Sequence, residues 1–279
     1  MKKLKVMIAA ACALALSACL LAGCSSNAAS NDKKDASSDK GKTTLVVGFD
    51  QAYPPYGFVG DDGNFTGFDL DLAAEVASRN GWDIKLEPID WDAKDTLLNS
   101  GAITCIWNGF TMEGREDGYT FSDPYMLNEQ VVVVKAGSDI SDFAGLSGKT
   151  VMTQVDSAAL DVLEGDQAEV AATFKGGAAQ TIGDYNNAFM QLDSGMIDAV
   201  ACDLSIAQYQ ISANPGKYVQ LETPLSTEHY AVGFKKGNTE LANQVTETLK
   251  QLDADGTVKK LCEKYASYGI SYDNWVLGK

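Results

Sequence analysis

Histidine is nearly absent from this sequence of 279 residues, in which His229 is the only one. Metal sites built on histidine, and most Ser-His or Cys-His catalytic arrangements, are therefore excluded. Six cysteines occur, but their irregular spacing matches no metal-ligand pattern. We predict no metal, no cofactor and a structural role for His229. Cys105 and Cys262 fit small buried hydrophobes, with a disulfide between them as the alternative.

Basic residues are also few, with 22 Lys and Arg against 38 Asp and Glu and a formal net charge of −16. The leader described next contains Lys2, Lys3 and Lys5 and no acid, so its removal leaves 19 basic residues and a charge of −19. Nucleic-acid binding needs a positive surface, and we therefore exclude nucleic acid as a partner.

After residue 43 no hydrophobic run is long enough to cross a membrane, but the N-terminus is different. A positive segment precedes an apolar run over residues 6–22, and LAGC then ends at Cys24. This pattern predicts a lipoprotein signal over residues 1–23, with Cys24 lipidated and residues 24–42 forming a disordered tether. The alternative, an uncleaved membrane-spanning helix, fits the small residues and the polar stretch less well. Acyl chains on Cys24 would hold the protein at the outer face of the cytoplasmic membrane.

Alternating strand and helix patterns fill the rest of the chain. We expect strands at residues 44–49, 84–88 and 103–107, with helices between them at 69–80 and 92–99. Asp69 is expected to cap the first helix, which Asn80-Gly81 ends. A second series follows, with strands near residues 131–135, 150–153, 198–203 and 230–234 and helices beginning near Ser157, Asp184, Ser205 and Asn238. Two α/β units with mainly parallel sheets flanked by helices are therefore predicted.

Two opposite charges follow apolar strands in these two units. Residues 108–115 (NGFTMEGR) end in Arg115, whose planar fork of donors fits a carboxylate with two bonds. Asp203 ends the strand that begins near residue 198. A cation on one wall of a cleft and an anion on the other would hold a zwitterion, as a free amino acid is. The alternatives are a surface Arg115 paired with Glu116 or Asp117, and Asp203 as a helix cap.

The sequence resembles family 3 of the bacterial solute-binding proteins, which serve ABC importers of polar amino acids. The resemblance spans essentially everything after residue 43, and it is carried by residues 48–58 (GFDQAYPPYGF), 67–72 (GFDLDL), 108–125 and 146–151 (LSGKTV). It implies a two-lobe fold of the type II periplasmic-binding-protein kind. Lobe 1 would comprise residues 43–128 and 227–279 and lobe 2 residues 129–226, with two crossover segments as the hinge and the ligand cleft between the lobes.

The resemblance also implies roles for the residues of the cleft. Arg115 and Thr111 would bind the α-carboxylate, helped by Ser157 and Ala158 at a helix N-terminus. Asn108, Gly109 and Asp203 would receive the α-ammonium group. Tyr53 and Trp91 would flank the ligand side chain, and Asp50 would contact its far end. Two departures from the family pattern are a spacing between Thr111 and Arg115 that is one residue short, and Asp156 where a glycine is frequent.

These features predict a lipid-anchored, monomeric receptor that delivers a polar amino acid to an ABC permease with its ATPase. Glutamine, arginine or lysine, histidine and cystine remain open as ligands. The alternatives are a dehydratase-like enzyme on the same scaffold and an amino-acid sensor. An enzyme would need an acid–base group over the substrate, for which Asp50 and Glu113 are the only candidates, and we therefore predict no enzymatic activity.

Overall fold

The computed structural model describes residues 43–279. The predicted signal segment, Cys24 and the tether lie outside the described residues. Within them, no helix combines the length and the apolar character needed to cross a membrane. Cys105, Cys202 and Cys262 are buried free thiols, so the disulfide left open above is not formed.

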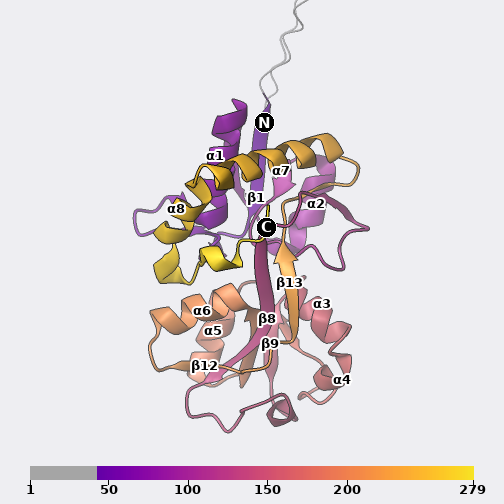
Figure 1. The fold of residues 1–279 in the computed structure, drawn as a ribbon. Coiled ribbons are helices and arrows are strands. Elements are labelled where there is room, and N and C mark those ends of the chain that lie inside the picture. The colour runs from indigo at the N-terminus through magenta and orange to yellow at the C-terminus, as the bar shows by residue number, and fades with distance from the viewer. Residues whose placement is uncertain (1–42) are drawn as a thin grey trace, which may run out of the picture. The chain divides into compact units, whose positions relative to one another are not determined.

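The first sheet contains strands from both ends of the described chain, in the order β5-β1-β6-β14-β7. β1 pairs in parallel with β5 and β6, whereas β14 is antiparallel to both β6 and β7. Helices α1, α2, α7 and α8 and a small sheet of β2, β3 and β4 accompany it, and we call this part lobe 1 (Figure 1). Its elements are β1 (Thr44–Phe49), β2 (Ala52–Tyr53), β3 (Gly57–Val59), β4 (Phe65–Thr66), α1 (Phe68–Asn80), β5 (Asp83–Pro88), the 3₁₀ helix η1 (Trp91–Ala93), α2 (Lys94–Ser100), β6 (Cys105–Ile106), β7 (Tyr119–Phe121), β14 (Gly233–Lys235), α7 (Thr239–Ala254), α8 (Thr257–Lys264) and the 3₁₀ turns η3 (Ala266–Tyr268) and η4 (Tyr272–Asn274).

The second sheet has the order β10-β9-β11-β8-β12, with β13 paired to β8. β9 is parallel to β10 and β11, while β8 is antiparallel to β11, β12 and β13. Figure 1 shows α5 and α6 on one side of this sheet and α3 and α4 on the other, and we call this part lobe 2. Its elements are β8 (Met126–Lys135), η2 (Ala144–Leu146), β9 (Val151–Gln154), α3 (Ala158–Glu164), α4 (Ala168–Ala171), β10 (Gln180–Ile182), α5 (Tyr185–Ser194), β11 (Ala199–Asp203), α6 (Leu204–Ala213), β12 (Tyr218–Gln220) and β13 (Ser226–Tyr230).

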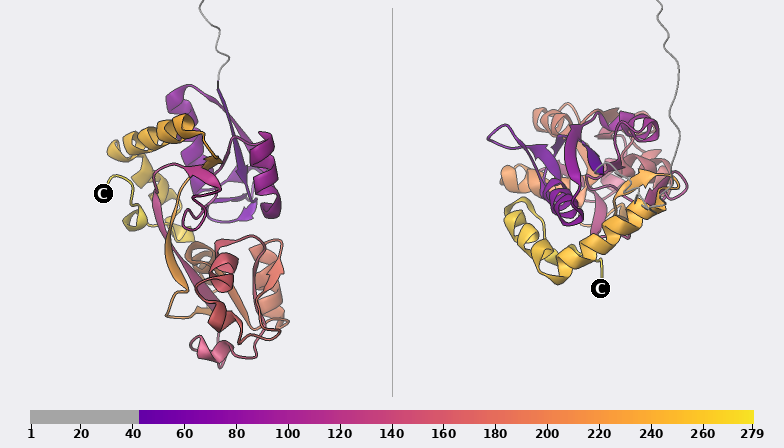
Figure 2. Two further views of the ribbon diagram at one scale, coloured as in Figure 1. Left: turned by 90° about the vertical axis from the view of Figure 1, so that its right-hand side faces the viewer. Right: turned by 90° about the horizontal axis from the view of Figure 1, so that it is seen from above.

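The α/β fold thus has two mixed sheets rather than mainly parallel ones. In these two sheets the antiparallel pairs of lobe 1 involve β14, and those of lobe 2 all involve β8. β8 enters lobe 2 and β13 leaves it beside β8, with Ser226 opposite Gln130 and Tyr230 opposite Met126. Figures 1 and 2 show these two crossover strands passing together between the lobes. The predicted boundaries at residues 128/129 and 226/227 fall within β8 and β13.

One apolar core runs through the crossover region, and each lobe has a smaller core of its own. The large core joins β1 and α1 to residues of β8, β11 and α6, including Val131, Val200 and Ile206. The smaller ones lie under α3 in lobe 2 and around Phe110 in lobe 1. Burial of this apolar surface holds the crossover strands in place, so polar side chains on them are presented at fixed positions.

Helix ends follow the residues that the sequence places there, with one correction. Ser157 and Asp184 accept bonds from Leu160 N and Asn187 N and so cap α3 and α5, and Gly81 ends α1 in the left-handed conformation. Asp69 does not cap α1, because the cap position is Gly67. Its carboxylate turns inward instead and accepts bonds from Gly109 N and the Tyr125 hydroxyl.

Candidate functional site

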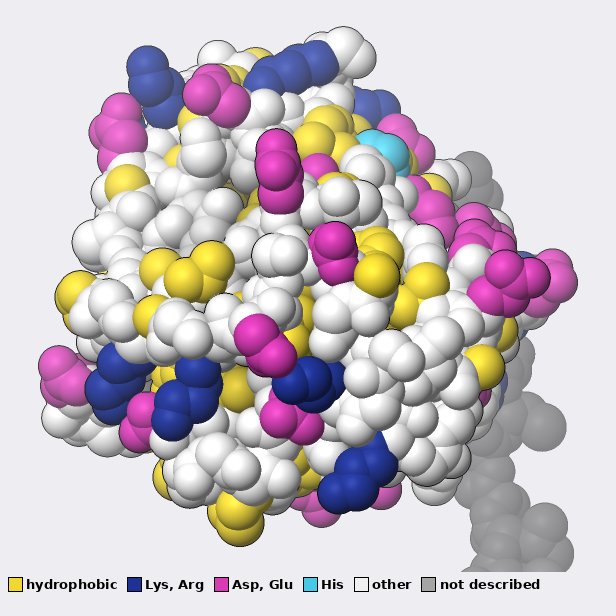
Figure 3. Space-filling view, turned by 90° about the horizontal axis from the view of Figure 1, so that it is seen from below, with side chains coloured by type: hydrophobic (Ala, Val, Ile, Leu, Met, Phe, Trp, Pro, Cys, Tyr) yellow, Lys and Arg dark blue, Asp and Glu magenta, His cyan; other side chains and the backbone are white. Residues whose placement is uncertain are grey.

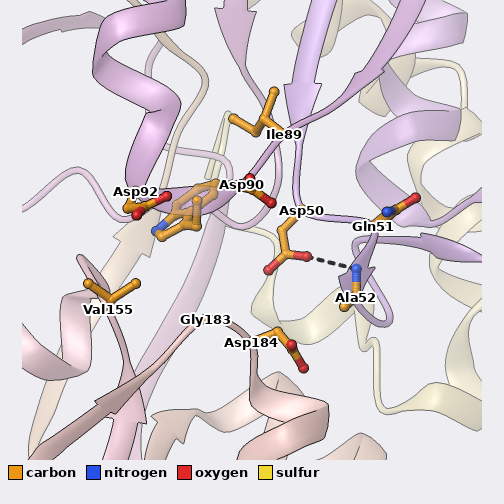
Figure 4. Close-up of a pocket in the computed structure, with 10 residues that line it drawn as sticks. Asp50, Gln51, Ala52, Ile89, Asp90, Asp92, Val155, Gly183 and Asp184 are labelled. Atoms are coloured by element: carbon orange, nitrogen blue, oxygen red, sulfur yellow. Dashed lines mark hydrogen bonds between the residues drawn. The ribbon is translucent and has the colours of Figure 1, made fainter.

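A cleft of about 330 Å³ lies where the two lobes meet. Lobe 1 contributes residues 50–52 and 89–92, and lobe 2 contributes Val155, Gly183 and Asp184. Figure 4 shows Asp50, Asp90 and Asp92 on one side of this space and Asp184 on the other. Four carboxylates therefore line the cleft, and its lining includes no Lys or Arg. The lining favours a positively charged or hydrogen-bond-donating group.

Asp50 lies at the end of β1 and contacts both lobes. Its carboxylate accepts a bond from Ala52 N at 2.8 Å and one from the amide of Gln154, in lobe 2, at 2.7 Å. Its own N–H donates to the side-chain oxygen of Asn108 at 2.8 Å. Burial raises the pKa of Asp50, and the two donated bonds oppose that shift.

The two predicted aromatic residues lie in separate surroundings. Trp91 lines the cleft and donates from Nε1 to the carbonyl of Asp156 at 3.2 Å. Tyr53 is buried among other tyrosines, with its hydroxyl 3.4 Å from that of Tyr230 and its ring centre 6.2 Å from that of Tyr185. Only Trp91 faces the cleft in this arrangement, while Tyr53 lies next to Asp203.

Asn108 and Gly109, which follow β6, are held in place by hydrogen bonds to other parts of lobe 1. Gly109 has φ +57°, and a Cβ there would lie 3.1 Å from the Tyr230 ring and 3.2 Å from the Tyr53 ring, so only glycine fits without strain. Its N–H donates to Asp69 at 2.6 Å. The buried Nδ2 of Asn108 has no hydrogen-bond partner among the described residues. This backbone therefore comes close to the tyrosines that surround Asp203.

Arg115 reaches across to lobe 2. Its guanidinium donates to Asp161 at 2.7 Å and to the carbonyl of Asp156 at 3.4 Å, and it lies over the ring of Phe110. The side chain is 12% exposed. Pairing with Glu116 or Asp117, the alternative considered above, is replaced by pairing with α3 of the other lobe. The guanidinium is thus directed at the lobe interface.

Asp156 and its neighbours form the lobe 2 side of this contact. Asp156 has φ +60°, unusual for a residue other than glycine. Its carboxylate pairs with the ammonium group of Lys94 from lobe 1, which is 3% exposed. Ser157 caps α3 and lies 3.2 Å from the Thr153 hydroxyl, and Ala158 begins that helix. Sequence reasoning missed Lys94, because a single lysine at a helix start carries no sign of burial.

Asp203 lies at the end of β11 and is 5% exposed. It occupies the N-cap position of α6, but its side chain makes no capping bond. The carboxylate instead accepts bonds from the amides of Asn128 and Gln130 at 2.9 and 2.7 Å and from the Tyr230 hydroxyl at 2.9 Å. Burial raises its pKa, and the hydrogen bonds oppose that shift.

Glu228 is a second buried carboxylate at this place, and sequence reasoning missed it. Its Oε1 accepts a bond from the hydroxyl of Thr111 at 2.6 Å and bonds from Asn128 and Gln130 at 2.9 and 2.7 Å. A signal for it was present in the sequence, because residues two apart on a strand point to the same side. Asn128 and Gln130 form one such pair, and Glu228 and Tyr230 form another. Thr111, predicted to bind a carboxylate, thus donates to an acid of β13.

The predicted residues therefore form two groups at the lobe interface. One lies around Asp156, and the other around Asp203. No direct hydrogen bond or ion pair joins Arg115 to Asp203, and neither residue lines the cleft of Figure 4. The first group contains Trp91, Arg115, Ser157 and Ala158, and the second contains Tyr53, Asn108, Gly109, Thr111 and Asp203. Asp50 lies on the cleft.

Contacts between the lobes close the structure over the cleft. The polar contacts between the lobes around the cleft include Asp50–Gln154, Trp91–Asp156, Lys94–Asp156, Arg115–Asp161 and Ala52–Asn186. These pairs involve different elements of each lobe. An opening motion would break them together, whereas the bonds within each sheet would stay intact.

Two α/β lobes, two adjacent crossover strands and a polar cleft between the lobes define a type II periplasmic binding protein. The chain belongs to the bacterial extracellular solute-binding proteins, family 3, which it matches over residues 45–268. The expected two-lobe fold and family are both confirmed.

The relatives are amino-acid-binding proteins. The L-cystine-binding protein TcyJ of Escherichia coli (strain K12) is 29% identical over 229 residues, which cover 81% of this chain and 84% of that protein. The arginine-binding extracellular protein ArtP of Bacillus subtilis (strain 168) is 28% identical and covers 95% of this chain and 98% of its own. A histidine-bound ABC uptake transporter substrate-binding protein from Streptococcus pneumoniae has a TM-score of 0.78 and 31% identity, covering 82% of this chain and 94% of its own.

Proposed function

We propose that this protein is the substrate-binding component of an ABC importer and captures a polar L-amino acid between its two lobes. The observation that carries the proposal is the pair of opposite charges at the lobe interface, with Arg115 from lobe 1 directed at α3 and Asp203 at the end of β11 in lobe 2. Family membership and amino-acid-binding relatives support it. The β8 and β13 strands would act as the hinge, with lobe boundaries at residues 128/129 and 226/227.

In this proposal the ligand replaces contacts that now join the lobes. The α-carboxylate would take the guanidinium of Arg115 from Asp161, with Thr111, Ser157 and Ala158 beside it. The α-ammonium would bind Asp203, with the backbone of Gly109 and the side chain of Asn108 nearby. Hydrogen bonds to charged groups contribute about 1.5–3 kcal/mol each, so a few suffice for the roughly 8 kcal/mol of micromolar binding.

The ligand side chain would extend into the cleft beside Trp91 and Asp50, whereas Tyr53 would lie nearer the ammonium end, next to Asp203. Because four carboxylates line that cleft, a ligand with a second positive group is favoured over one with an uncharged amide. Arginine and lysine carry such a group in the side chain, and cystine carries it as a second α-ammonium. These two classes are also those bound by the relatives TcyJ and ArtP. Glutamine stays as the weaker candidate.

The remaining parts of the proposal concern location and chemistry. We propose that residues 1–23 are removed, that Cys24 is lipidated, and that residues 24–42 tether a monomer to the outer face of the cytoplasmic membrane. There it would hand its ligand to a permease and ATPase. We also propose that the ligand leaves unchanged. The one histidine supports this, because His229 is bonded to Glu113 at 2.7 Å and is not among the residues that line the cleft.

The surface of the protein fits a small ligand better than a polyanion. On the face in Figure 3, basic and acidic side chains are interspersed and no continuous positive area is seen. The net charge of −16 also disfavours the binding of a polyanion.

Isothermal titration of the full chain with the twenty amino acids and cystine tests the proposal. We expect binding of a cationic amino acid or cystine, recovery of that ligand unchanged, and loss of the binding heat in Arg115→Ala and in Asp203→Ala. A converted product would indicate an enzyme. Binding that survives both substitutions would remove these residues from the site.

A further inference from the structure

We infer that Glu228 binds the ammonium group of the ligand together with Asp203, so that two carboxylates hold one amine. The inference rests on the proposed function, since it names a further residue of the same site. Glu228 lies on the crossover strand β13 and Asp203 at the end of β11.

The two carboxylates are close because they share their hydrogen-bond donors. The Nδ2 atom of Asn128 is 2.9 Å from Oδ1 of Asp203 and 2.9 Å from Oε1 of Glu228. The Nε2 atom of Gln130 is 2.7 Å from each of the same two oxygens. Two neighbouring side chains of β8 therefore bridge one oxygen from each acid.

The charge of this pair is not balanced by the protein. The partners of Glu228 are Thr111, Asn128 and Gln130, and those of Asp203 are the same two amides with Tyr53 and Tyr230. All of them are neutral, and within residues 43–279 no Lys or Arg forms an ion pair with either acid. Two carboxylates that are 5% and 3% exposed are costly without a cation.

A further atom at the same place lacks a donor. The Oε1 atom of Gln130 is buried and accepts no hydrogen bond among the described residues, although Nε2 of the same amide is bonded to both acids. The Gln130 side chain is fully buried. An ammonium group carries three N–H donors and one positive charge. It would supply the positive charge that the two carboxylates lack and the hydrogen-bond donor that the Gln130 oxygen lacks.

Other neighbours of the pair do not provide the charge. The titratable groups that face Asp203 and Glu228 are phenols and a thiol, from the β2 region, β11, α5 and β13, namely Tyr53, Tyr56, Cys202, Tyr185 and Tyr230. Burial raises the pKa of each of these groups, so they stay neutral. His229, next in sequence, is bonded to Glu113 instead.

Proton release on binding follows from this arrangement. Burial raises the pKa of Glu228 and of Asp203, and the charge of Asp203 raises that of Glu228 further, and both effects favour a proton on one of the two acids before the ligand binds. An arriving ammonium group supplies the positive charge in its place, and the proton passes to the buffer. The amount released reaches about one proton per ligand when the free pair is fully singly protonated.

The test is calorimetric titration of the full chain at pH about 6.5, once in phosphate and once in imidazole buffer. The two buffers take up protons with different heats, so the difference between the measured heats gives the number of protons released. L-arginine, L-cystine, L-glutamine and L-histidine are the probes. In Glu228→Gln we expect the proton release to disappear and the affinity to fall roughly ten- to a hundredfold. The matched control is Glu129→Gln, since Glu129 lies on β8 between the two bridging residues and is half-buried with no bond to the pair. The control should match the wild type in both quantities.

The outcomes separate the inference from the proposed function. If the wild type binds none of the four probes, the proposed function fails and the inference with it. If the wild type binds but Glu228→Gln matches it in affinity and proton release, the inference alone fails. If Glu228→Gln does not fold, a crystal structure of the wild type with its bound ligand decides, because a ligand ammonium group beyond hydrogen-bond distance of the Glu228 carboxylate would overturn the inference.

Discussion

The ion pair between Lys94 and Asp156 allows one prediction about lobe closure. Lys94 begins α2 in lobe 1, and Asp156 precedes α3 in lobe 2, so their contact exists only when the lobes meet. The carbonyl of Asp156 also accepts bonds from Trp91 and Arg115. Asp156 tolerates the required φ of +60° as a polar residue, and asparagine does so equally. Asp156→Asn therefore removes the charge and leaves the backbone unstrained.

The size of the effect follows from the exposure of the two partners. A hydrogen bond between charged groups contributes about 1.5–3 kcal/mol. The Lys94 side chain is 3% exposed but the Asp156 side chain is 49% exposed, which places the pair near the lower end. We expect Asp156→Asn to shift the balance between open and closed forms by about 1–2 kcal/mol, roughly 5–30-fold toward open. The melting temperature should change little, because an opened Lys94 becomes hydrated.

Fluorescence energy transfer between one dye on each lobe measures this balance. Asp139→Asn is the matched control, since the Asp139–Lys149 pair lies within lobe 2 at 3.1 Å. Lys94→Met should act like Asp156→Asn, and the double variant should add little to either one. A closed fraction that stays at the wild-type value in Asp156→Asn would refute the reasoning.

Two further predictions concern residues beneath the site. Burial raises the pKa of Asp69 from 3.8 to about 7, so the stability that its protonated form contributes is fully present below pH 3.8 and lost as the pH rises through about 7. Asp69→Asn should therefore weaken the fall in melting temperature between these pH values, and an unchanged pH profile would contradict this. Gly109→Ala should lower the free energy of unfolding by about 1–2 kcal/mol, because alanine is strained at φ +57° and its methyl group meets two tyrosine rings. A chemical denaturation midpoint equal to that of the wild type would contradict it.

Much of the fold could be predicted from local signals in the sequence. Ser157, Asp184 and Gly81 mark helix ends that the structure has, because caps depend on neighbouring residues. The strand expected over residues 230–234 is instead the end of β13 and the start of β14. The chain changes partners there from β8 to β6 and β7, and local patterns carry no information about partners.

The contacts of the site were less predictable. Thr111 meets Glu228 and Lys94 meets Asp156 across separations of 117 and 62 residues, which only the tertiary fold brings together. Aspartate is a common helix-capping residue, and Asp69 was therefore expected to cap α1. The packing of α1 instead directs its carboxylate toward Gly109 and Tyr125. Charge and residue type thus predicted a site, and the crossover strands determine which of the predicted groups lie together.

The most direct test of amino-acid capture between the lobes is a crystal structure of the protein with its bound amino acid. We expect the α-carboxylate within hydrogen-bond distance of the Arg115 guanidinium and the α-ammonium within that distance of Asp203. A ligand bound elsewhere, or one that contacts neither residue, would contradict the account.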